Sequence, residues 1–86
     1  MEIKLEFVLR EIAGDLLLVP AGKTALDFNG MITLNEVGGE VWKLLPLVAD
    51  EEELIARLLE EYDVEESVLR QDVEAFLGEL RALKII

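Results

Sequence analysis

The sequence predicts an α+β fold, in which an N-terminal three-stranded antiparallel sheet packs on a C-terminal three-helix bundle. Two observations indicate this order. Apolar residues alternate with period two early in the chain, whereas from Val37 onward they recur every three or four residues. Strands followed by helices are typical of α+β folds. With 86 residues, the chain is expected to form a single domain, residues 1–86, around one core.

The first two strands are expected to form a hairpin. Residues 5–12 alternate roughly between apolar and polar side chains, and Ala13-Gly14-Asp15 supplies turn residues before the apolar run 16–19. Pro20 should end the second strand, because proline has no N–H to donate to a ladder.

A third strand is expected at residues 31–34. The dipeptide Asn29-Gly30 that precedes it favours a type I′ hairpin turn, since both residues tolerate positive φ. The alternative therefore stays open that residues 25–28 form an additional strand paired with it.

The first helix is expected to begin near Leu34, with either Thr33 or Asn35 as its N-cap. The pair Gly38-Gly39 costs a helix roughly 1 kcal/mol per glycine relative to alanine, so we expect a close backbone contact there. Pro46 should stop or kink this helix. Large aromatic residues bury much area, so Trp42 is expected in the core beside the apolar stripe of the helix.

Two further helices follow. The run Asp50-Glu51-Glu52-Glu53 suits a helix start, because acidic groups stabilise the positive end of the helix dipole. The last helix is expected from Glu65 onward. Its predicted buried face places apolar residues at alternating steps of four and three: Leu69, Val73, Phe76, Leu80 and Leu83.

The charge excludes several classes of partner. Eight Lys and Arg residues against nineteen Asp and Glu residues give a formal net charge of −11. Such a polyanion is repelled by phosphate backbones and by anionic lipid surfaces, so we expect neither nucleic acid nor membrane as a partner. The sequence shows no apolar run of membrane-spanning length and no signal-peptide pattern, so a cytoplasmic location is expected.

The chain has no Cys and no His. Thiolate chemistry, imidazole catalysis and nearly every zinc, copper or iron site are thereby excluded, and we expect no metal and no cofactor. Ser67 is the only serine, and it has no histidine to act as its base. The sequence therefore predicts a protein that is not an enzyme.

Several segments resemble the PqqD family. The most specific is Leu34-Asn35-Glu36 at a helix start with Trp42 downstream, and the likeness extends from about residue 6 to the end. The segments that carry it are 7–14, 28–36, 41–45, 60–64 and 72–80.

The resemblance implies a winged-helix-like peptide chaperone, also described as a recognition element for ribosomally made, post-translationally modified peptides. In this family the leader of a precursor peptide adds as a strand to the third strand, in a cleft closed by the third helix, and a modifying enzyme does the chemistry. For this chain it implies that the receiving strand is Met31, Ile32, Thr33 and Leu34, and that the helix wall is Leu69, Asp72, Val73 and Phe76.

The resemblance further implies a radical SAM maturase as the partner enzyme, without identifying the precursor or the product. Residues 21–30 look longer than the matching connection in the family member of pyrroloquinoline quinone biosynthesis. Residues 31–34 contain neither charge nor proline, which commonly protect edge strands, so this strand is either covered by residues 21–30 or open to a partner. The alternative function is an acidic structural or oligomerising module, such as a homodimer, without a peptide ligand.

Overall fold

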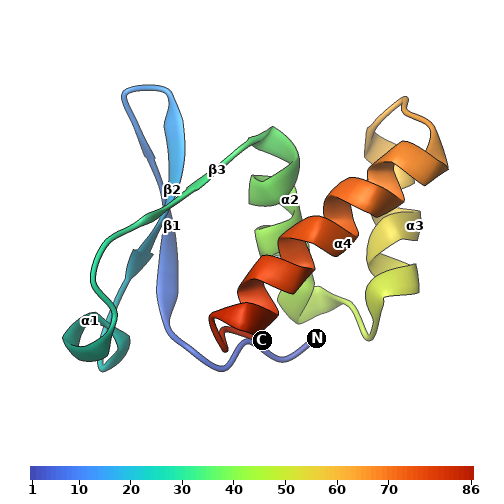
Figure 1. Cartoon of the computed structure of the whole chain (residues 1–86). Coiled ribbons are helices and arrows are strands. Elements are labelled where there is room, and N and C mark those ends of the chain that lie inside the picture. The colour runs from blue at the N-terminus through green and yellow to red at the C-terminus, as the bar shows by residue number, and fades with distance from the viewer.

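The computed structural model describes all 86 residues, and its strands precede its long helices (Figure 1). The α+β class expected from the sequence is thereby confirmed. In chain order, the elements are β1 (Phe7–Ile12), β2 (Asp15–Pro20), α1 (Thr24–Asp27), β3 (Ile32–Leu34), α2 (Glu36–Leu44), the 3-10 helix η1 (Leu45–Leu47), α3 (Glu51–Glu61) and α4 (Glu66–Ala82).

The sheet is antiparallel with the order β1-β2-β3, so β3 lies at an edge. A two-residue turn joins β1 to β2, with positive φ at both Ala13 (52°) and Gly14 (86°), as the expected hairpin requires. β3 pairs with β2 through Leu16↔Leu34 and Leu18↔Ile32. Leu18 and Leu34 are buried, and this face of the sheet packs on the helices.

The additional strand considered for residues 25–28 is absent, because the segment forms the short helix α1. Two tertiary contacts hold this helix. The hydroxyl of Thr24 accepts a hydrogen bond from the backbone N–H of Glu6 at 2.9 Å, and the ring of Phe28 packs edge-on against Phe7 with 5.2 Å between centroids. Gly30 has φ +100°, but no hairpin follows, since β3 pairs with β2.

Helix α2 begins at Asn35, whose side chain accepts a hydrogen bond from the N–H of Gly38 at 2.7 Å. Of the two N-caps considered, Asn35 is therefore the one used. The close contact expected at the glycine pair is present, because a Cβ on Gly39 would lie 2.8 Å from Cδ1 of Leu16. The helix gives way to η1 immediately before Pro46, as expected.

Helices α3 and α4 complete the core. Asp50 caps α3 by accepting from the N–H of Glu53 at 2.9 Å. On α4, the buried face includes Leu77, while Leu83 is 43% exposed, so the burial expected for Leu83 was wrong. The reason is local: Lys84 turns left-handed (φ 63°), and the chain then buries Ile85 instead, whose N–H bonds to the carbonyl of Leu80 at 2.9 Å.

The helices are joined by packing and by one exposed ionic contact. Arg70 of α4 donates to both carboxylate oxygens of Glu52 on α3 at 2.6 and 3.1 Å, and this contact lowers the pKa of Glu52. Fourteen buried apolar residues from the sheet and the helices form one cluster. None of the helices combines the length and the apolar character needed to cross a bilayer.

Trp42→Ala is expected to lower the free energy of unfolding by about 3–5 kcal/mol, the usual cost of deleting a large buried aromatic ring. Trp42 is 8% exposed, belongs to the core cluster and packs edge-on against Phe7, with 6.2 Å between ring centroids. Chemical denaturation measures the change. Leu47→Ala is the control, because Leu47 is 63% exposed and should cost no more than about 0.5 kcal/mol. A loss below about 1 kcal/mol for Trp42→Ala would show that Trp42 is not a core residue.

Candidate functional site

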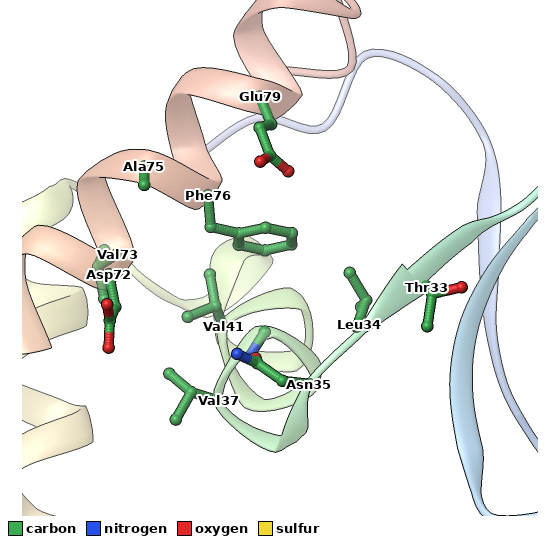
Figure 2. Close-up of a pocket in the computed structure, with 11 residues that line it drawn as sticks. Thr33, Leu34, Asn35, Val37, Val41, Asp72, Val73, Ala75, Phe76 and Glu79 are labelled. Carbon is green, nitrogen blue, oxygen red and sulfur yellow. The ribbon is translucent and has the colours of Figure 1, made fainter.

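A cavity of about 300 Å³ lies between β3 and the start of α2 on one side and α4 on the other (Figure 2). The ring of Phe76 extends from α4 toward Leu34, and Val41 lies behind them on α2. The cavity is lined by eleven residues: Thr33, Leu34, Asn35, Val37, Gly38, Val41, Asp72, Val73, Ala75, Phe76 and Glu79.

Five of the eight residues that the sequence suggested for a peptide site line this cavity: Thr33, Leu34, Asp72, Val73 and Phe76.

The other three lie elsewhere. Leu69 is 3% exposed and belongs to the core, whereas Met31 precedes β3 and is 58% exposed. Ile32 is half-buried, packs against the core cluster and pairs with Leu18. None of these three lines the cavity.

The sequence reasoning missed the contribution of α2 and one acid of α4. Val37 and Val41 lie four residues apart on α2, and Glu79 lies three residues beyond Phe76 on α4, so helical spacing could have grouped each with a cavity face. Asn35 and Gly38, which the sequence places at the start of the helix, also line the cavity. Their hydrogen bond places the first turn of α2 at the cavity rim.

Strand register shows which backbone groups of β3 face outward. The N–H of Ala21 donates to the carbonyl of Glu6 at 3.0 Å, so these two residues form a hydrogen-bonded pair. In an antiparallel ladder the next pair, Phe7↔Pro20, then has no hydrogen bonds between its residues, which suits the missing N–H of proline. Backbone groups alternate in direction along a strand, so the N–H and C=O groups of the even-numbered residues of β2 point toward β3. There they pair with Ile32 and Leu34.

Thr33 consequently directs its own N–H and C=O away from β2, toward the open edge of the sheet. Its side chain is exposed and points away from the cavity (Figure 2). The site thus combines one unpaired main-chain donor and acceptor with a cavity beside them, of whose eleven lining residues six are hydrophobic. This pair of features suits an extended peptide, whose backbone bonds to an edge and whose alternate side chains fill a pocket.

The charged groups of the cavity are acidic. Asp72 and Glu79 both line it, and neither takes part in an ion pair. Seven residues on one helix place them about 10 Å apart along the axis. The structure contains no cluster of three or more side chains suited to holding a metal ion.

The fold is similar to that of a solved structure, and the sequence matches a family model. The chain is similar to a solved structure titled "TbiB1 in Complex with the TbiA(beta) Leader Peptide", with a TM-score of 0.71 and 24% identity, over 99% of this chain and 93% of that chain. No curated protein sequence matches the chain. The family model described as "Coenzyme PQQ synthesis protein D (PqqD)" matches residues 8–86, which is most of the chain, and the protein therefore belongs to the PqqD family.

Proposed function

We propose that this protein is a peptide chaperone that binds the leader of a ribosomally synthesised precursor by strand addition to β3. The observation that carries the proposal is the open edge at Thr33 beside a cavity to which Leu34, Val73 and Phe76 contribute apolar side chains. The similar TbiB1 structure, whose title names a bound leader peptide, supports it.

In the proposed complex, the leader forms the fourth strand and runs antiparallel to β3, because antiparallel pairing is slightly more stable per residue. The N–H and C=O of Thr33 bond to the leader backbone. Alternate leader side chains then point into the cavity between Leu34, Val73 and Phe76. The main-chain bonds supply affinity for any extended peptide, and the cavity selects apolar side chains.

The protein itself carries out no chemistry in this proposal. Its cavity is lined by two carboxylates and an amide but holds no nucleophile paired with a base. It presents the bound leader to a modifying enzyme, for which a radical SAM maturase is the class that the family resemblance implies. Co-purification of the two proteins only when leader peptide is present would support this presentation step.

The alternative, an acidic oligomerising module without a peptide ligand, would use the same edge. Two copies could pair their β3 strands and so satisfy the groups at Thr33. Each copy, however, carries a net charge of −11, which opposes self-association. Sedimentation at low and high salt measures whether a homodimer forms. A homodimer paired through β3 would not bind added peptide, because the partner copy already occupies the edge.

Thr33→Pro is expected to weaken peptide binding at least tenfold, since it leaves a peptide carbonyl unsatisfied at a cost of about 1–3 kcal/mol and places the proline ring in its path. The fold should persist, because the N–H of Thr33 is not used in pairing with β2 and proline is tolerated at edges. The probe is a peptide selected from a displayed random library on the wild-type protein, titrated by calorimetry.

Thr33→Val is the matched control, because it removes the exposed hydroxyl and keeps the N–H. Binding should then stay within about threefold of the wild type, as for an ordinary surface change. Equal binding by the proline and valine variants would refute strand addition at this edge.

Phe76→Ala is expected to weaken binding of the same peptide by about 5- to 30-fold, in the range of an aromatic anchor at an interface centre. The half-buried ring of Phe76 lines the cavity. Val68→Ala is the control, since Val68 lies on the same helix, is 50% exposed and does not line the cavity. If both substitutions leave the dissociation constant unchanged, the cavity does not receive the peptide.

A further inference from the structure

A second cavity, of about 480 Å³, lies between α1 and the end of α4, with residues 4–6 between them. Three of the four lysines of the chain line it: Lys4, Lys23 and Lys84. We call it the lysine pocket. Its apolar lining includes Phe28 and Leu83.

The charge balance within the lysine pocket is opposite to that of the whole molecule. Its three lysines outnumber its two carboxylates, Glu6 and Asp27, whereas acidic residues outnumber basic residues 19 to 8 in the whole chain. None of the three lysines has a carboxylate oxygen within 4.0 Å, because the ion pairs of the structure involve only Lys43 and Arg70. The pocket therefore presents lysine ammonium groups that are not neutralised by direct contact.

The lysine pocket and the first cavity lie along the same two segments of the chain. On α4, Phe76 and Glu79 line the first cavity, and Leu83 lies one turn beyond Glu79 on the same side of the helix. On the opposite wall, Thr33 and Leu34 line the first cavity and Phe28 lines the second. Figure 1 shows the chain passing from α1 into β3 on one side while α4 descends on the other.

We infer that the lysine pocket is a second subsite for the same leader peptide and that it takes an aspartate or glutamate side chain. The inference rests on the proposed strand addition at Thr33. A peptide antiparallel to β3 has its C-terminal side beyond Met31, in the direction of Phe28. The acidic residue therefore lies on the C-terminal side of the residues that pair with β3.

The two cavities together specify a charge order in the leader. The first cavity, with Asp72 and Glu79, favours a lysine or arginine beside the apolar anchor, and the lysine pocket favours a carboxylate downstream. The net charge of −11 repels acidic peptides in general. A preference of the protein for an acidic residue at one position of the peptide would therefore come from a local group of positive charges, such as the three lysines of the lysine pocket.

A selection of displayed random peptides of about 16 residues tests the inference, since at about 3.3 Å per residue such peptides span both cavities. It is run on the wild type and on Lys4→Gln/Lys23→Gln/Lys84→Gln. The wild type should enrich Asp or Glu C-terminal to the apolar strand segment, and the triple variant should lose that enrichment while still binding peptides. Lys43→Gln is the control, because Lys43 pairs with Glu40 and lies outside both cavities.

An enriched peptide and its copy with the acid replaced by Asn or Gln are then titrated against the wild type. The replacement should raise the dissociation constant about three- to tenfold at low salt, with little change at 0.5 M salt, as for partly exposed charge pairs. Peptides that bind without acid enrichment, or equal enrichment on the triple variant, would overturn the second subsite and leave strand addition intact. Enrichment of no peptide at all would overturn both.

Discussion

The pairing of β3 with β2 on one side only is the constraint on which the site depends. Pro20 and the hydrogen bond between Ala21 and Glu6 fix which residues of β2 direct their backbone N–H and C=O groups toward β1. Because these groups alternate along a strand, the N–H and C=O of Thr33 then point away from β2. The same register turns Leu34 into the core and starts α2 at Asn35. The open edge and the cavity wall therefore arise from one strand register.

The sequence predicted most of the fold because each long helix carries its own apolar period, and α2 and α3 also carry a side-chain N-cap. It left open whether residues 25–28 form a strand, because the local preference of Asn29-Gly30 for a hairpin turn does not reveal the contacts of this segment with Glu6 and Phe7, which are distant in sequence. Leu83 was misplaced for a similar reason, since the left-handed turn at Lys84 lets Ile85 take the buried position.

Five of the eleven cavity residues could be anticipated from the family resemblance, which indicated β3 and the face of α4. The residues of α2 and the lysine pocket depend on how distant segments meet. Lys4, Lys23 and Lys84 share no spacing in the sequence, yet they line one cavity because α1 and the end of α4 both lie beside residues 4–6. The acidic and basic cavities are both lined by residues at successive turns on the α4 side, Glu79 and Leu83, which is why we infer that one extended peptide contacts both.

Hydrogen exchange at single amides tests the central claim most directly, because it separates neighbouring residues of β3. In the free protein, the N–H of Thr33 should exchange fast, while those of Ile32 and Leu34, which face β2, exchange slowly. Saturation with a selected peptide should slow exchange at Thr33 by at least about tenfold, since its N–H then joins the ladder. A Thr33 amide that is already protected in the free protein, or that exchanges at the same rate in the complex, would contradict strand addition at this edge.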